Sequence, residues 1–72
     1  MLDYVSIGKQ FRQQRKNLNL TQGIVAHIAG LSLSYYGHIE RGARIPSLET
    51  FVKIVDVLGL SADQVLSITP HA

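Results

Sequence analysis

The 72-residue sequence contains no cysteine and no tryptophan, and its longest unbroken run of apolar residues has three members. The absence of cysteine excludes a disulfide, a thiolate metal site and a cysteine nucleophile. The absence of a long apolar run predicts no membrane span and no signal peptide. A hydrophobic content of 46% with 17% charged residues favours a folded chain. We therefore expect one small domain, residues 1–72, working in the cytoplasm.

Acidic residues are scarce over most of the chain. From Tyr4 to Leu48 there are six basic residues and one acid, Glu40, which gives this segment a net charge of +5. From Glu49 onward the net charge is −2. A basic segment and a sequence pI of about 9.3 are typical of proteins that bind polyanions. The alternative is an ordinary solvated surface.

Helix start and stop signals predict an all-α fold with five helices. Hydroxyl side chains that can cap a helix precede apolar stretches at Thr21, Ser32, Ser47 and Ser61. Residues that accept the left-handed conformation of a helix end stand at Asn19, Gly30, Gly42 and Gly59. The expected helices are 7–18, 22–29, 33–41, 48–58 and 62–67.

Apolar residues at 3.6-residue spacing predict the core. The first three helices contribute Ile7, Phe11, Leu18, Val25, Ala26, Ala29, Tyr36 and Ile39. The last two contribute Leu48, Phe51, Val52, Val55, Leu58, Val65 and Leu66.

The second and third expected helices, about residues 22–41, form a helix-turn-helix. Only Gly30, Leu31 and Ser32 separate them, and a short turn that begins with glycine is typical of this motif. The small side chain of Ala26 lets the two axes approach closely. With the core side chains turned inward, the opposite face of the third helix consists of Leu33, Ser34, Gly37 and His38.

Several short runs stand in the order and at the spacing of a known family. They are Leu20-Thr21-Gln22, Gly30-Leu31-Ser32, Ile39-Glu40-Arg41-Gly42, Pro46-Ser47-Leu48-Glu49-Thr50 and Leu58-Gly59. With Ala26, they make the chain resemble the phage repressor/Cro-like (XRE-type) helix-turn-helix family over roughly residues 7–66. The resemblance implies a five-helix repressor-like domain whose third helix enters the major groove of double-stranded DNA. It therefore implies a sequence-specific transcriptional regulator, acting as a homodimer.

The resemblance also implies roles for individual residues. Base edges would be faced by Leu33, Ser34, Gly37 and His38. Backbone phosphates would be contacted by Gln22, Ser32, Tyr35, Arg41 and Arg44. Arg15 and Glu40 occupy positions that form an ion pair between the first and third helices.

Apolar residues near the C-terminal end exceed what one short helix can bury beneath itself. We expect the contact between two copies of the chain to involve Val57, Leu66 and Ile68, with the C-terminal helix, about 62–67, at its centre.

Other function classes lack support in the residues. There is no Ser/His/Asp order, no phosphate loop and no pair of carboxylates, so we expect neither an enzyme nor a cofactor. His27 and His38 lie on different helices without a third ligand, which predicts no metal site. Ile24 and Ile28 stand one turn apart on the outer side of the second helix. They are either harmlessly exposed or the contact of an antitoxin-like or other protein-interaction module, in which DNA binding is secondary.

Overall fold

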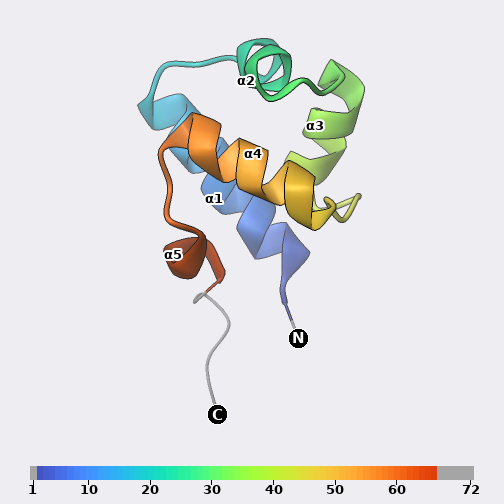
Figure 1. Ribbon diagram of the computed structural model, residues 1–72, viewed down its shortest axis with the longest axis vertical. Coiled ribbons are helices and arrows are strands. Elements are labelled where there is room, and N and C mark those ends of the chain that lie inside the picture. Colours follow the sequence, from blue (N-terminus) through green and yellow to red (C-terminus); the bar gives the residue numbers. More distant parts are fainter. Residues whose placement is uncertain (1, 67–72) are drawn as a thin grey trace.

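The computed structural model describes residues 2–66, and this part of the chain is built from five α-helices (Figure 1). They are α1 (Tyr4–Asn17), α2 (Gln22–Ala29), α3 (Leu33–Glu40), α4 (Leu48–Leu58) and α5 (Ala62–Leu66). In Figure 1, α4 crosses in front of α1, α2 lies above them and α3 lies to one side. The all-α prediction is confirmed.

The predicted capping residues precede four of the helices, and Ser61 accepts from the Gln64 backbone N–H at 3.4 Å. The hydroxyls of Thr21, Ser32 and Ser47 each accept a hydrogen bond from the backbone N–H three residues later, at 3.1 Å in each case. These bonds satisfy amides that have no partner inside a helix. The predicted bounds of α2 and α4 are confirmed.

The bounds of the other helices differ from the prediction. Helix α1 begins at Tyr4 rather than at residue 7, because the Asp3 carboxylate caps it by accepting from the Ser6 backbone N–H at 3.2 Å. Helix α3 ends at Glu40, with Arg41 as its C-cap. Helix α5 is described as far as Leu66, so residue 67 of the expected helix lies outside the described residues.

The core lies where the five helices meet. Side chains with no exposure include Phe11 of α1, Val25 of α2, Tyr36 of α3, Leu58 of α4 and Val65 of α5. The rings of Phe11 and Phe51 pack at a centroid distance of 6.0 Å, which joins α1 to α4.

Four residues expected in the core are exposed, namely Leu18, Leu48, Val52 and Leu66, and the prediction for them is wrong. Leu18 is the C-cap of α1, where the chain turns away from the core. The error on α4 has a different cause, since Leu48 and Val52 lie at one edge of a wide apolar arc whose centre is the part that faces the core. The buried side is the stripe of Phe51, Ile54, Val55 and Leu58, and Ile54 had not been expected there.

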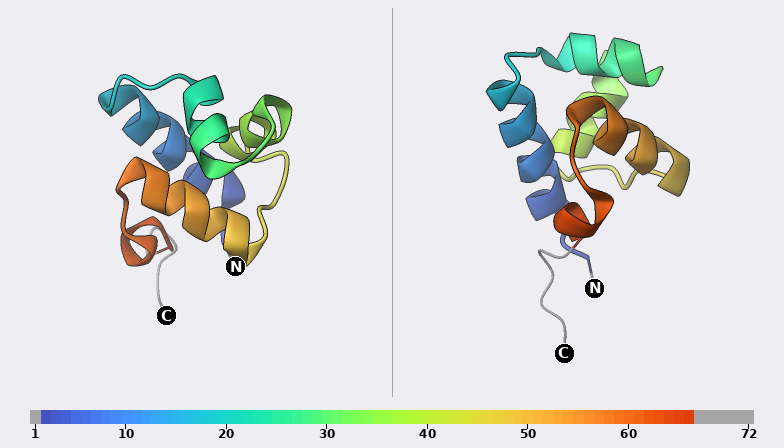
Figure 2. Two further views of the ribbon diagram at one scale, coloured as in Figure 1. Left: turned by 45° about the horizontal axis from the view of Figure 1, so that its top comes forward. Right: turned by 60° about the vertical axis from the view of Figure 1, so that its left-hand side comes forward.

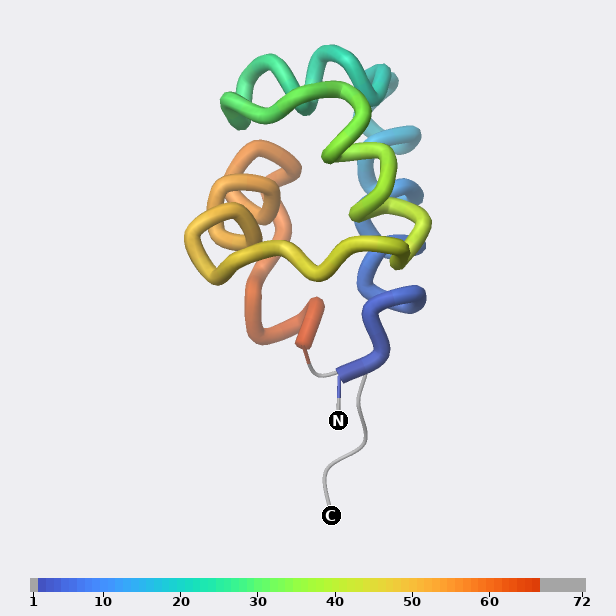
Figure 3. The backbone as a smooth tube through the Cα atoms, turned by 90° about the vertical axis from the view of Figure 1, so that its right-hand side faces the viewer, coloured from blue at the N-terminus to red at the C-terminus, as the bar shows by residue number. Residues whose placement is uncertain are grey.

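Helices α1 and α3 lie side by side (Figure 3). They approach each other closely at Gly8. Gly8 is buried, and a Cβ atom added there would overlap the backbone carbonyl of Glu40. The absence of a side chain at this position therefore lets the last turn of α3 rest on α1. The two views in Figure 2 show α2 and α3 as a pair at one end of the molecule, and no other helix in the described part lies over the outer side of α3.

Candidate nucleic-acid interface

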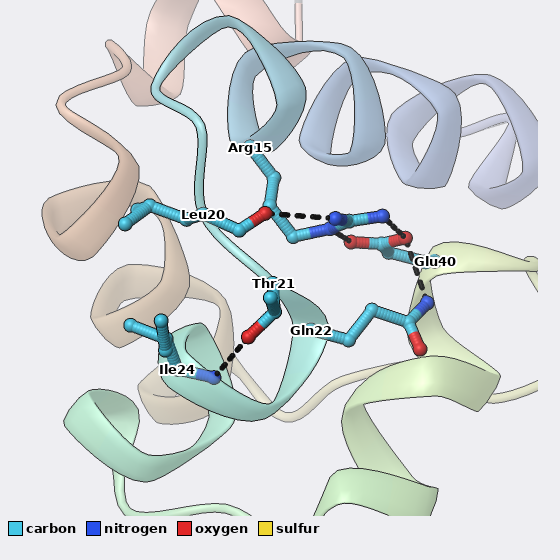
Figure 4. A network of polar contacts seen from close by, with 6 residues as sticks. All are labelled: Arg15, Leu20, Thr21, Gln22, Ile24 and Glu40. Atoms are coloured by element: carbon cyan, nitrogen blue, oxygen red, sulfur yellow. Dashed lines mark hydrogen bonds and ion pairs between the residues drawn. The ribbon is translucent and has the colours of Figure 1, made fainter.

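An ion pair between Arg15 and Glu40 ties α1 to the end of α3 (Figure 4). Arg15 Nε donates to Glu40 Oε2 at 2.6 Å, and Arg15 Nη2 donates to Glu40 Oε1 at 3.2 Å. Arg15 Nη1 also donates to the carbonyl oxygen of Leu20 at 2.9 Å. The structure thus brings together the two residues that the sequence paired. One guanidinium holds α1, the connection before α2 and the C-terminal end of α3 in a fixed arrangement.

Burial makes this pair electrostatically strong. The side chains of Arg15 and Glu40 are only 11% and 2% exposed. Burial alone would raise the pKa of Glu40, but hydrogen bonds from Arg15 and Gln22 outweigh it and lower that pKa below its ordinary value. The hydrogen bond to Glu40 in turn raises the pKa of Arg15. Both groups are therefore held in their charged forms.

Gln22 joins the same network. Its Nε2 donates to Glu40 Oε1 at 2.9 Å, so one of its two amide N–H groups is used inside the protein. The second N–H is the only one left for the phosphate contact that the sequence suggested. Sequence reasoning missed this bond because it assigned Gln22 to a phosphate contact alone.

The Tyr36 hydroxyl lies fully buried in the core, and no hydrogen-bond partner for it is found among the described residues. Burial raises the pKa of this hydroxyl, and the nearby Glu40 carboxylate raises it further. Tyr36 is therefore neutral at any physiological pH and serves as a packing residue of α3.

The outer face of α3 presents Leu33, Ser34 and His38. Leu33 is 56% exposed, Ser34 is exposed and His38 is half-buried. Ser32, exposed at the start of the helix, uses its oxygen to cap α3 and keeps its O–H for another acceptor.

Gly37, which was expected on the exposed face, is not exposed in this structure, and its role toward DNA bases stays a prediction. It is buried, because two polar side chains cover it. A Cβ at this position would lie 3.3 Å from Arg41 Nη1 and 3.5 Å from Gln22 Oε1. Arg41 is one turn beyond Gly37, so its side chain folds back along α3 into the space that the missing side chain leaves.

The folded-back Arg41 also contacts His38. Arg41 Nη2 donates to His38 Nδ1 at 2.9 Å. A guanidinium has only donors, so Nδ1 must be the acceptor and a neutral imidazole then carries its proton on Nε2. The bond thus defines the tautomer of His38.

The remaining predicted phosphate ligands, Tyr35 of α3 and Arg44 of the following loop, contact each other. The guanidinium of Arg44 stands 5.6 Å from the centre of the Tyr35 ring, a cation–π contact that holds this loop cation against the helix. Arg44 is exposed and Tyr35 is half-buried.

The residues expected at a contact between two copies are only partly described. Val57 is half-buried and Leu66 is 36% exposed, whereas Ile68 lies outside the described residues. No helix within residues 2–66 is long and apolar enough to cross a membrane. Over the same residues, no three His, Asp or Glu side chains form a cluster that could hold a metal ion.

Comparison with known proteins identifies the family. The family description "Helix-turn-helix" matches residues 11–65. The chain belongs to the helix-turn-helix family. Within this family, the chain is 38% identical over 60 residues to the cryptic phage CTXphi transcriptional repressor RstR of Vibrio cholerae. That match covers 83% of this chain and 54% of the repressor, so the chain spans about half of the repressor's length.

Solved structures of other regulators share the helix-turn-helix fold. The restriction-modification controller protein C.AhdI from Aeromonas hydrophila superposes with a TM-score of 0.82 at 33% identity, over 88% of this chain and 96% of the controller. The P22 c2 repressor, solved in complex with a synthetic operator, gives a TM-score of 0.79 at 26% identity, over 85% of this chain and 92% of the repressor.

The Arg15–Glu40 pair of this helix-turn-helix domain generates a stability prediction. Arg15→Met should lower the free energy of unfolding by about 3 kcal/mol, because it leaves a buried carboxylate without its cation. Glu40→Met should cost a similar amount, and the double variant should cost less than the sum of the two. Chemical unfolding at pH 7 measures the coupling, and strictly additive losses would show that the pair contributes none.

The same pair should make the domain acid-sensitive. Because the folded-state pKa of Glu40 is lowered from the ordinary 4.5, its stabilisation is full above that pH and is lost as the pH falls through the lower folded value. The Glu40→Met variant should lose less stability over this range. The dependence that remains belongs partly to Asp3, whose pKa is lowered by its hydrogen bonds from Ser6.

Proposed function

We propose that this chain is a sequence-specific DNA-binding transcriptional regulator, of repressor type, that inserts α3 into the major groove. The observation that carries the proposal is the uncovered face of α3, with Ser34 and His38 at its centre and cations at its end. The P22 c2 repressor, which has the same fold, was solved with an operator. The proposed activity is binding without catalysis, in the cytoplasm where the target DNA lies.

The backbone contacts would come from groups that surround α3. The O–H of Ser32 and the free N–H of Gln22 are donors near the N-terminal ends of α3 and α2, where helix amides also favour an anion. Arg41 and Arg44 follow the helix and are exposed, so both can reach phosphate while keeping their contacts with His38 and Tyr35.

Binding should depend steeply on salt. If a dimer neutralises about 6–8 phosphates, a plot of log K against log salt concentration falls with a slope near −5 to −7. The experiment is selection of bound sites from random duplexes, followed by titration of the selected duplex at several salt concentrations. Arg44→Gln should reduce the slope without changing the preferred sequence.

Two results would contradict this function. One is the absence of binding to any selected duplex at low salt, and the other is binding that does not change with salt. Either would favour the protein-interaction alternative, for which the exposed Ile24 and Ile28 on α2, 45% and 60% exposed, offer the contact.

His38 is proposed to donate to a base in the major groove, and N7 of a purine is the acceptor tested below. With Nδ1 engaged by Arg41, the ring presents an N–H at Nε2. This N–H can donate to N7 of guanine or adenine, O6 of guanine or O4 of thymine, but the ring cannot accept from an exocyclic amine. Arg41 therefore positions His38 Nε2, the atom proposed to contact the base, in addition to any phosphate contact of its own.

Replacing the purine N7 by carbon tests this assignment. At one position of the selected half-site, a 7-deazapurine should weaken binding of the natural chain by about 1 kcal/mol, which is about five-fold. The same base analogue should have no effect on His38→Ala and a reduced effect on Arg41→Met. If every deaza position weakens both proteins equally, His38 does not read N7.

We further propose that two copies of the chain bind together, because one α3 spans only a half-site. The contact would use Val57 of α4 and Leu66 of α5, of which Leu66 is exposed and Val57 is half-buried, in the part of the sequence that is acidic. Neither is among the α3 residues assigned to DNA.

Sedimentation with and without the selected duplex tests the dimer. Leu66→Ser should shift the equilibrium toward the monomer and weaken binding to a two-half-site duplex, whereas Ile28→Ser should change neither. The reverse pattern would place the interface on α2. Ile28 is a matched control because it is exposed and apolar and lies on a different helix.

A further inference from the structure

A second basic surface lies on α1, outside the residues assigned above. Lys9, Arg12 and Lys16 are spaced so that they fall on one side of the helix, and all three are exposed. With Gln13 they line a shallow hollow of about 260 Å³. We call Lys9, Arg12, Gln13 and Lys16 the α1 basic face. Among residues 2–66, none of the three cations of this face forms an ion pair.

A larger hollow connects the α1 basic face to the end of α3. It has a volume of about 470 Å³ and is lined by Val5, Lys9, Arg12, Arg15, Gln22, Glu40 and Arg41. Its one carboxylate, Glu40, is already bonded to Arg15 and Gln22. The excess charge of this hollow is therefore positive, and it comes from Lys9, Arg12 and Arg41. Cations thus continue without interruption from α1 to the proposed phosphate ligands of α2 and α3.

We propose that the α1 basic face binds the phosphodiester backbone of the duplex next to the half-site that α3 reads. This inference rests on the proposed function, since it needs the duplex to be placed by α3. Lys9 and Lys16 are about 10 Å apart along the helix axis at 1.5 Å per residue. A single small anion spans less than this length, whereas a strand of duplex DNA presents a phosphate for every ~3.4 Å of its axis.

Because one hollow joins the α1 basic face to Gln22 and Arg41, the α1 basic face would contact the same duplex as α3. Arg41 and Gln22 border the hollow on the α3 side, and both are proposed to contact phosphate at the edge of the half-site. A backbone that leaves those two residues and continues outward would meet Arg12 and Lys9 next. The α1 basic face would therefore add affinity without reading sequence.

The test compares two duplexes that carry the same selected site. The short duplex ends at the contacted base pairs, and the long duplex extends ~10 base pairs of unrelated sequence on each side, about one helical turn. The natural chain should bind the long duplex more tightly and with the steeper salt slope. Arg12→Gln and Lys9→Gln should each reduce the slope by about 0.9 on the long duplex and leave the short duplex unchanged.

Lys53→Gln is the matched control. It removes one positive charge from a half-exposed lysine on α4 that lines neither hollow, and its loss breaks only a surface pair with Glu49. It should bind both duplexes as the natural chain does. Circular dichroism and unfolding curves should show that all three variants keep the fold.

The outcomes separate this inference from the proposed function. If the natural chain binds no duplex, the proposed function fails and this inference fails with it. If the natural chain binds both lengths equally, or if Arg12→Gln weakens both lengths alike, only the flanking contact is overturned. An effect of Lys53→Gln as large as that of Arg12→Gln would likewise overturn it, because overall charge would then explain the result.

Discussion

The arrangement of α2 and α3 relative to α1 depends on the ion pair between Arg15 and Glu40. Glu40 is the last residue of α3, and its carboxylate accepts two hydrogen bonds from Arg15 and one from Gln22. A buried charge is costly unless its hydrogen-bonding capacity is met, and here three donors meet it. Arg15 also donates to the carbonyl oxygen of Leu20. A single side chain of α1 therefore holds both the segment before α2 and the C-terminal end of α3. These hydrogen bonds hold α2 and α3 on the side that faces α1, and they leave the outer face of α3 uncovered.

That fixed geometry explains how α3 accommodates a glycine. Gly37 in mid-helix costs about 1 kcal/mol relative to alanine. Gln22, held by Glu40, and Arg41, one turn further on, both cover the position, and a side chain there would crowd Arg41. The glycine therefore lets Arg41 lie along the helix and reach His38. Gly37 has no side chain of its own, and the guanidinium of Arg41, one turn further on, occupies the space beside it and offers N–H donors there.

Local signals made much of the fold predictable, whereas contacts between helices were not predictable from local patterns. The Arg15–Glu40 pair was expected from the family resemblance alone. The hydroxyl caps and the glycine after Ala29 set the bounds of α2, because they act within one turn of the chain. On α4 the prediction included Leu48 and Val52, which lie at the exposed edge of the apolar arc, and left out Ile54, which lies at its buried centre. The burial of Gly37 depends on Gln22 from another helix, so no pattern within α3 could show it. The spacing of Lys9 and Arg12, in contrast, was visible in the sequence.

The uneven distribution of charge along the chain becomes a separation of surfaces in the fold. Lys9 and Arg12 of α1 meet Arg41 in one hollow, whereas three of the five acidic residues stand on α4 and α5. In a two-fold contact through α4 and α5, the same surface of each copy would face its partner, so the acids of the two copies would be near each other. The basic surfaces of the two copies would lie away from that contact, and repulsion between them would be weaker there than in a contact through α1. The same separation leaves both copies of α3 and both basic surfaces of α1 open to one duplex. The proposed contact between two copies and the proposed DNA-binding surface therefore use different helices of the described chain.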